Sequence, residues 1–372
     1  MRTMCQRCGG TSPAVTRSLG ICAGCIQQDF AAASPHIDQA HIRARSRFGL
    51  PDHPPRAEAG WRCRICLNEC SLATGDTGYC GLRHRGADRL TGATADAANV
   101  SWYHDALPTN CVADWVCPGG TGAGHPEFAC RDGPEYGYRN LAVFYHACSF
   151  DCLFCQNWQF RTYARHESKV SASTLADAVD RHTSCVCYFG GDPGPQMPHS
   201  LRSARLALQR NPGRILRICW ETNGSMHPSL LRQAAAIALD SGGCIKIDLK
   251  AWDEGLHLAL CGVSNRRTLE NFRLLAEYAR ARPSPPLLVA STLLVPGFVD
   301  RQEVSRLAGF IASVDPDIPY SLLAFAPQFM MSDLPTTSRR HAEECLAEAK
   351  ARGLKRVRIG NVHLLEGDCP PV

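Results

Sequence analysis

Three cysteines lie close together in the segment Ala147–Asn157, which reads Ala-Cys-Ser-Phe-Asp-Cys-Leu-Phe-Cys-Gln-Asn and which we call the triple-cysteine loop. The spacing Cys148-x3-Cys152-x2-Cys155 allows three thiolates to hold three irons of a [4Fe–4S] cluster. A structural zinc site or a fully ligated cluster needs a fourth ligand, and the loop contains no fourth cysteine. The loop therefore leaves one iron open to a ligand that binds and reacts. The alternative is a zinc or ferredoxin-type loop completed by a distant cysteine.

Polar residues follow several apolar runs further along the chain. The run Cys185–Phe189 leads into Gly190-Gly191-Asp192-Pro193. Glycines let a ligand approach the backbone closely, and a carboxylate accepts hydrogen bonds from an amine. Taken alone, this string is also typical of a plain turn. The apolar run Ile215–Trp220 is followed by Asn223. The run Cys244–Leu249 contains Asp248 and is followed by Lys250.

The elements that must position these residues begin near Leu141. Short apolar runs there predict strands at Leu141–Tyr145, Cys185–Phe189, Ile215–Trp220, Cys244–Leu249, Leu287–Leu294, Pro319–Phe325 and Arg356–Ile359. Helical spacing between them predicts helices at Ser171–Arg181, His199–Arg210, Pro228–Asp240, Arg267–Arg280, Arg301–Ser313 and Ser338–Gly353. This alternation predicts an α/β fold with a parallel sheet, as a partial (β/α)6-type TIM-like barrel. Its polar strand ends would meet at one mouth.

Cysteine spacing and residue pattern divide the chain into five parts. We expect a zinc-ribbon-like module over 1–30, a polar linker over 31–58, and a Cys-rich metal-binding region of loops and short strands over 59–135. The partial barrel would cover 136–365, and a short tail 366–372.

Cysteines outside the loop form further sets. Cys5, Cys8, Cys22 and Cys25 have zinc-ribbon spacing, and a unit of thirty residues needs a metal to fold, so we expect zinc there, with rubredoxin-like iron as the alternative. A second set predicts either zinc or an auxiliary iron–sulfur cluster, and comprises Cys63, Cys66, Cys70 and Cys80.

The remaining cysteines carry weaker signals. Cys111, Cys117 and Cys130, with His125, either ligate a further cluster or are unrelated thiols. Four cysteines in apolar strand runs are expected to act as small hydrophobic residues, namely Cys185, Cys187, Cys219 and Cys244. Cys261 follows a strand end and is a candidate for hydrogen-atom or proton transfer.

Taken together, the loop, its strand context and the glycine turn resemble the radical S-adenosylmethionine (SAM) superfamily. The strings Trp220–Gly224, Lys246–Asp253 and Thr292–Asp300 are similar to the pyruvate formate-lyase activating enzyme branch, and Phe325–Thr337 with Cys63–Arg83 to the radical enzyme of the AmmeMemoRadiSam system. The resemblance implies that SAM binds the open iron. It also implies that Phe154 packs on the adenine, that Asp192 meets the amine, and that further residues bind the cofactor, namely Asn157, Gly190, Gly191, Pro193, Asn223, Asp248 and Lys250.

The resemblance implies a radical enzyme. An external one-electron reductant of the flavodoxin or ferredoxin kind would reduce the cluster, and cleavage of SAM would yield a 5′-deoxyadenosyl radical that takes hydrogen from a peptide, protein, RNA or metabolite. One alternative is an activase that forms a glycyl radical on a partner protein. Another is a non-catalytic zinc or iron–sulfur protein that binds a partner or transfers electrons.

The composition of the chain limits the class of protein and the partners that we expect. The 372 residues are 45% hydrophobic, which excludes global disorder, and a net charge of +5 favours neither a nucleic-acid nor an acidic partner. The chain lacks a secretory leader pattern and an apolar stretch of about 20 residues, so we expect no membrane partner and a cytoplasmic location. In that compartment, the 21 cysteines favour metal binding over disulfides.

Overall fold

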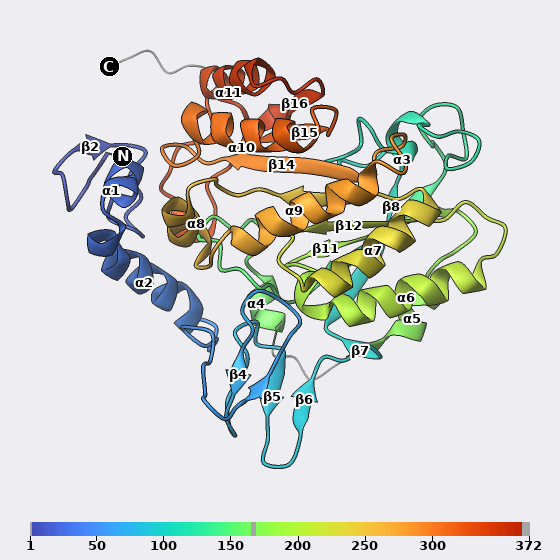
Figure 1. Cartoon of the computed structure of the whole chain (residues 1–372), viewed down its shortest axis with the longest axis horizontal. Coiled ribbons are helices and arrows are strands. Elements are labelled where there is room, and N and C mark those ends of the chain that lie inside the picture. The colour runs from blue at the N-terminus through green and yellow to red at the C-terminus, as the bar shows by residue number, and fades with distance from the viewer. Residues whose placement is uncertain (1, 165–168, 367–372) are drawn as a thin grey trace.

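The computed structural model describes residues 2–164 and 169–366, so residues 367–372 of the expected tail lie outside the described part. An eight-stranded sheet forms its centre, in the order β16-β15-β14-β13-β12-β11-β9-β8 (Figure 1). Seven strands run parallel: β9 (Arg139–Tyr145), β11 (Thr183–Gly190), β12 (Arg217–Thr222), β13 (Ile245–Asp248), β14 (Leu288–Leu294), β15 (Tyr320–Ala324) and β16 (Val357–Gly360). The predicted α/β fold with a large parallel sheet is confirmed, and each predicted strand is present.

Helices cover the outer side of this sheet (Figure 1). They are α5 (Ala172–Asp177), α6 (Met197–Arg210), α7 (Pro228–Ser241), α8 (Glu254–Cys261), α9 (Arg266–Ala279), α10 (Arg301–Val314) and α11 (Arg339–Ala351). Local residues set their ends. Asp300 accepts hydrogen bonds from the amides of Gln302 and Glu303 and so begins α10, while Gly242, with a φ of 77°, ends α7.

Two elements escape prediction from the sequence. Strand β8 (Val100–Ala106) pairs antiparallel with β9 at the sheet edge, and its mostly exposed residues give it no apolar pattern. Helix α8 has eight residues, too few to show a clear helical period. It begins at the N-cap Asp253, whose carboxylate accepts a hydrogen bond from the amide of Leu256.

The segment 31–58, expected to be a linker, differs from that prediction. After α1 (Ala23–Gln28), helix α2 spans Phe30–Ser46 and packs on α8. Its buried residues recur at helical spacing, but most are small or polar rather than apolar: Ala33, Ile37, Ala40, His41, Ala44 and Arg45. A count of large apolar residues therefore misses the packed face.

The segment that contains Thr16 and Ser18 docks on residues that lie far along the chain. The Thr16 hydroxyl donates to Oδ1 of Asp333 at 2.7 Å, and the Ser18 hydroxyl donates to the carbonyl of Met330. One continuous buried cluster contains Ile26 and Ile37 together with Trp220 of the sheet. The N-terminal module thus shares its hydrophobic core with the sheet and its helices.

The remaining elements are short. Paired strands are β1 (Thr3–Met4) with β2 (Thr11–Ser12), β3 (Trp61–Arg62) with β4 (Ser71–Leu72), β5 (Arg83–Arg85) with β6 (Leu90–Gly92), and β7 (Ala97–Ala98) with β10 (Val170–Ser171). Short helices are α3 (Pro118–Thr121), α4 (Phe160–Tyr163), η1 (Gly194–Gln196), η2 (Phe329–Met331) and η3 (Val362–Leu364). Across the described ranges, every helix is too short or too polar to cross a bilayer.

Candidate active site

The triple-cysteine loop follows β9 and lies at the carboxyl end of the sheet. Its three cysteines line a cavity of about 230 Å³, which we call the loop cavity. The predicted site residues that line it are Cys148, Cys152, Phe154, Cys155, Asn157, Gly190, Gly191, Asp192, Asn223, Asp248 and Lys250. Pro193 and Cys261 are buried outside that lining. The structure therefore gathers most of the predicted set at the mouth expected from the strand ends.

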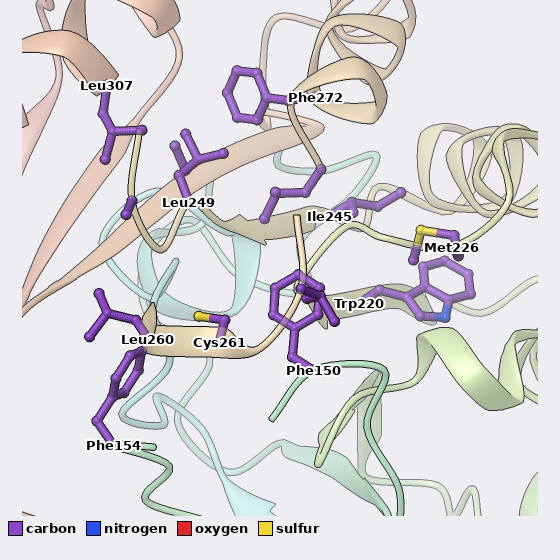
Figure 2. Close-up of a cluster of buried hydrophobic side chains, with 14 of the residues drawn as sticks. Phe150, Phe154, Trp220, Met226, Ile245, Leu249, Leu260, Cys261, Phe272 and Leu307 are labelled. Atoms are coloured by element: carbon purple, nitrogen blue, oxygen red, sulfur yellow. The ribbon is translucent and has the colours of Figure 1, made fainter. Parts of the chain in front are cut away.

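Helix α8 fixes the loop through backbone hydrogen bonds. The amides of Asp151 and Leu153 donate to the carbonyls of Cys261 and Leu260, both at 2.9 Å. The last carbonyls of a helix have no partner within it, so they are free to accept these bonds. Figure 2 shows the buried side chains of Phe154, Leu260 and Cys261 close together. The sulfurs of Cys152 and Cys261 lie 3.6 Å apart.

The two glycines after β11 are required by the space around them. Gly190 has a φ of 110°, a conformation that side chains rarely permit. A Cβ on Gly191 would lie 2.4 Å from the carbonyl oxygen of Ala147, at the start of the loop. The close approach of these two segments therefore depends on the missing side chains.

Asp192 is buried and ties the ends of β11 and β12 together. Its Oδ1 accepts from the Thr222 hydroxyl at 2.8 Å and from the amide of Asn223 at 2.9 Å, and its Oδ2 accepts from the amide of Gly194 at 2.8 Å. Burial raises the pKa of Asp192 to about 6. Each of these bonds goes to protein, so the described role of this carboxylate is to shape the cavity wall.

Asn223 connects the same wall to the loop. Its Nδ2 donates to the Ser149 hydroxyl at 2.9 Å and lies 3.7 Å from Sγ of Cys148. An amide donor next to a cysteine sulfur stabilises the thiolate form that binds metal.

Lys250 and Asp248 form an ion pair at the third strand end, with Nζ and Oδ2 2.6 Å apart. Ser291 donates to the other oxygen of Asp248 at 2.5 Å. Burial acts to lower the pKa of Lys250, but Asp248 and the neighbouring Cys152 together raise it above its usual value. The ammonium therefore stays charged beside the loop cavity.

Arg161, a residue that sequence reasoning missed, lies on the cavity wall. It donates to Oδ1 of Asp151 at 3.0 Å, and His41 of α2 lies 2.9 Å from Oδ2 of the same carboxylate. Burial acts to raise the pKa of Asp151, but His41 and Arg161 lower it to about 2. Only the position of Asp151 between two loop cysteines could have indicated this group of residues from the sequence. Arg161 and His41 lie in stretches without a motif. Glu221 and Phe189 also line the cavity without having been predicted.

The N-terminal cysteines form the tightest thiol group. The Sγ atoms of Cys5, Cys8, Cys22 and Cys25 all lie within 4.8 Å of one another. Two sulfurs that bind one tetrahedral zinc at about 2.3 Å lie about 3.8 Å apart. The Cys5–Cys25 and Cys8–Cys22 distances are 3.8 and 4.0 Å. This geometry makes the group a possible site for a single metal ion.

The second cysteine set has a different spacing. Cys63, Cys66, Cys70 and Cys80 line one small cavity, and the amide of Tyr79 donates to Sγ of Cys70 at 3.4 Å. Within residues 2–164 and 169–366, a 4.8 Å limit on the distances between ligand atoms selects the N-terminal cysteines and not this set. These four thiols are thus gathered but lie farther apart.

The third set of cysteines, Cys111, Cys117 and Cys130, does not lie in one place. Cys111 and Cys117 line a second cavity inside the sheet, whereas Cys130 lies outside its lining, where its amide donates to Oε1 of Glu135 at 2.8 Å. The structure therefore does not bring these three cysteines together as one ligand group. The strand cysteines Cys187, Cys219 and Cys244 join the first two instead.

Comparisons with known proteins agree with this geometry. The sequence pattern of the Radical SAM superfamily matches residues 142–310. The chain is 33% identical to the isethionate sulfite-lyase activating enzyme of Desulfovibrio desulfuricans over 137 residues. These aligned residues are 37% of this chain and 40% of that protein. It is 21% identical to the uncharacterized protein MJ0808 of Methanocaldococcus jannaschii over 326 residues. These aligned residues are 83% of this chain and 84% of that protein.

A third relative combines 33% identity with a match over two thirds of its own length. The M. jannaschii protein MJ1632, which bears the name "putative glycyl-radical enzyme activating enzyme", is 33% identical over 186 residues, which are 50% of this chain and 67% of that protein. The matched region of the superfamily pattern contains the triple-cysteine loop and the strands that line the loop cavity. The chain therefore belongs to the radical SAM superfamily.

Proposed function

We propose that this chain holds a [4Fe–4S] cluster through Cys148, Cys152 and Cys155, binds SAM in the loop cavity, and cleaves SAM reductively to begin hydrogen abstraction from a substrate. One observation carries the proposal. The three thiols share a single cavity with the glycine turn, Asn223 and the Asp248–Lys250 pair, which come from three other strand ends.

The residues present fit such a cluster. Among the described residues that line the loop cavity, these three cysteines are the only thiols. Cys261 does not line the loop cavity, and its sulfur lies 3.6 Å from that of Cys152, so we do not count it among the cluster ligands. Nη1 of Arg161 is buried and has no hydrogen-bond partner among the described residues, so it is available to a sulfide or thiolate of the cluster.

When bound, the cluster and SAM supply the electron transfer and the 5′-deoxyadenosyl radical. The chain supplies position and shielding. Helix α8 holds the loop, Asp192 fixes the strand ends, and the charged Lys250 offers a partner for a carboxylate. Aromatic side chains keep water from the cavity, namely Phe150, Phe154, Phe160 and Phe189.

A direct test is anaerobic reconstitution with iron and sulfide, followed by dithionite and SAM. We expect 5′-deoxyadenosine and methionine by liquid chromatography and mass spectrometry, and none from Cys152→Ala. Cys345→Ala removes a buried thiol of α11, outside the loop cavity, and should match the parent chain. If Cys152→Ala also matched it, the assignment of the loop would be wrong and a non-catalytic metal protein would be favoured.

For the substrate, the names of two relatives favour a second candidate, activation of a partner enzyme through a glycyl radical. The broader candidate is hydrogen abstraction from a peptide, protein, RNA or metabolite, and an external flavodoxin- or ferredoxin-like protein would serve as reductant for both. A peptide deuterated at a glycine Cα tests whether glycine is the site of hydrogen abstraction, as activation requires. Deuterium transfer into 5′-deoxyadenosine supports activation, and its absence with continued SAM cleavage favours another substrate.

We also propose different metals for the first two cysteine sets. The close tetrahedral group Cys5, Cys8, Cys22 and Cys25 suits zinc. The wider set Cys63, Cys66, Cys70 and Cys80 suits an auxiliary iron–sulfur cluster, because each thiolate of a cluster binds a different iron. Counting zinc and iron per chain in Cys5→Ala and Cys63→Ala variants tests both assignments, since each variant should lose only its own metal.

A further inference from the structure

A second cavity, of about 420 Å³, is lined by residues of the sheet and lies next to the loop cavity. We call it the thiol chamber. Phe189 and Glu221 line both cavities, so the two are neighbours. Its wall comes from β8, β9, β11, β12, β13 and the segment 107–120. Six cysteines line it: Cys111, Cys117, Cys185, Cys187, Cys219 and Cys244.

Most of these thiols contact one another rather than lying scattered over the wall. Cys187, Cys219 and Cys244 form one buried cluster, against which Cys111 and Cys117 pack. The sulfurs of Cys219 and Cys244 are 3.9 Å apart. Two backbone amides also face sulfur, since Cys244 donates to Sγ of Cys219 and Ala113 to Sγ of Cys111, both at 3.4 Å. Amide donors to sulfur are typical of metal-bound thiolates.

A buried cation sits among these sulfurs. The Lys246 side chain is 3% exposed, and its Nζ lies 2.8 Å from Sγ of Cys111 and 3.3 Å from Sγ of Cys187. It also pairs with Oε1 of Glu221 at 2.6 Å. A buried ammonium is unfavourable unless negative groups surround it. Glu221 gives this ammonium one negative partner, and the two sulfurs at its other side are placed to supply further negative charge as thiolates.

The spacing of the thiols distinguishes a cluster from a single ion. In the part of the chain that the structure describes, three or more ligand atoms lie within 4.8 Å of one another at the N-terminal cysteines and not in the thiol chamber. A lone tetrahedral ion would draw its thiolates to about 3.8 Å from one another. Cys219 and Cys244, whose sulfurs are 3.9 Å apart, suit two ligands of one iron, and among the described residues no third ligand atom lies within 4.8 Å of both, so the other thiols would bind a different iron.

We propose that the thiol chamber binds a second iron–sulfur cluster, with ligands drawn from Cys111, Cys117, Cys187, Cys219 and Cys244 and with Lys246 balancing its negative charge. The cluster would lie directly behind the loop cavity, separated from it by Phe189 and Glu221. The proposal concerns metal binding and stands independently of SAM cleavage.

The first test is anaerobic reconstitution of the full chain, with iron and acid-labile sulfide counted per chain. We expect Cys187→Ser/Cys219→Ser to lose at least two irons and two sulfides relative to the parent, while added SAM still changes the electron paramagnetic resonance spectrum of the reduced protein. Cys345→Ala, which removes an equally buried thiol elsewhere, should keep the parent values. Unchanged iron and sulfide in the double variant would overturn the proposal.

A second variant covers the case in which the double variant fails to fold. Cys63→Ala/Cys66→Ala/Cys152→Ala/Cys155→Ala leaves the thiol chamber intact and removes ligands of both other proposed clusters. We expect it to retain at least two irons and two sulfides per chain, and further addition of Cys111→Ser, on the segment after β8, to remove them. Retention of no iron by the quadruple variant, in a folded chain, would overturn the proposal.

Discussion

Nδ1 of His41 lies 2.9 Å from Oδ2 of Asp151, so helix α2 contacts the triple-cysteine loop between two of its cysteines. Nε2 of the same ring faces the carbonyls of Leu258 and Ala259 in α8, at 3.1 and 3.2 Å. One imidazole therefore joins α2, α8 and the loop. The N-terminal helix is part of the structure that positions the proposed cluster ligands.

Replacing this imidazole should loosen the loop. His41→Ala leaves the buried carboxylate of Asp151 with one partner fewer and removes a ring nitrogen that faces two carbonyls of α8, so we expect the free energy of unfolding to fall by about 1–3 kcal/mol. Anaerobic urea unfolding measures the change. Gln39→Ala, at an exposed position on the same helix, should change it by less than about 0.5 kcal/mol. Equal effects of the two variants would contradict the linking role of His41.

Adding one carbon at the glycine turn should disable the loop cavity. The Cβ of Gly191→Ala would lie 2.4 Å from the carbonyl of Ala147, so the turn or the loop must shift. We expect formation of 5′-deoxyadenosine to fall by at least tenfold. Gly309→Ala in α10, where a Cβ meets nothing within 4 Å, should keep full turnover. Full turnover in both variants would show that the close approach is dispensable.

The buried pair of Glu135 and Arg217 should be a large contributor to folding. Arg217 donates to both oxygens of Glu135, at 2.8 and 2.6 Å, and both residues are at most 1% exposed. Glu135→Gln leaves the guanidinium without its counter-charge, and we expect a loss of about 3–5 kcal/mol in the free energy of unfolding. Glu344→Gln, which removes one partner of an exposed pair, should cost less than about 1 kcal/mol. A loss below about 1 kcal/mol for Glu135→Gln would be inconsistent with the described pair.

Asp192 should make stability depend on pH. Because burial raises its folded-state pKa to about 6 from 3.8, the folded chain binds this proton more tightly than the unfolded chain. The contribution is full below about pH 4 and is lost as the pH rises through about 6. Two pKa units correspond to about 3 kcal/mol. We expect the difference in unfolding free energy between the parent and Asp192→Asn to change by about that amount between pH 4 and pH 7. A constant difference across that range would refute the buried titration, and Asp240→Asn, an exposed carboxylate of α7, is the matched control.

Removing the metal from the N-terminal group should release that segment. With a zinc chelator, we expect amide hydrogen exchange to increase over residues 5–26, because four thiols that share no ion repel one another as they ionise. Exchange in β12 and β13 should stay unchanged over the same interval. Unaltered protection of residues 5–26 in a chain freed of zinc would show that the contacts with Asp333 and Met330 suffice.

The sequence predicted those features that have a periodic or motif signal. All seven parallel strands contain short runs rich in apolar residues, and the polar residues at their ends meet because parallel strands share one carboxyl edge. Helix α2 escaped because its packed face is built from alanine, His41 and Arg45. Strand β8 escaped because an edge strand can be exposed on most of its residues.

The thiol chamber shows a different limit. Each of Cys187, Cys219 and Cys244 lies in an apolar run, so sequence alone treats it as a small hydrophobic residue. Only the register between neighbouring strands, which pairs Cys187 with Cys219, shows that they face one cavity. The contact of Lys246 with Cys111 joins residues 135 positions apart, and no local pattern encodes it.

The docking of Thr16 on Asp333 bears on how the protein is made. The two residues are 317 positions apart, so the ribosome must add almost the whole intervening chain before the early segment finds its partner. Until Asp333 has been added, the segment around Thr16 lacks this docking partner. The early N-terminal segment can therefore take its final position only after most of the described chain has been synthesised.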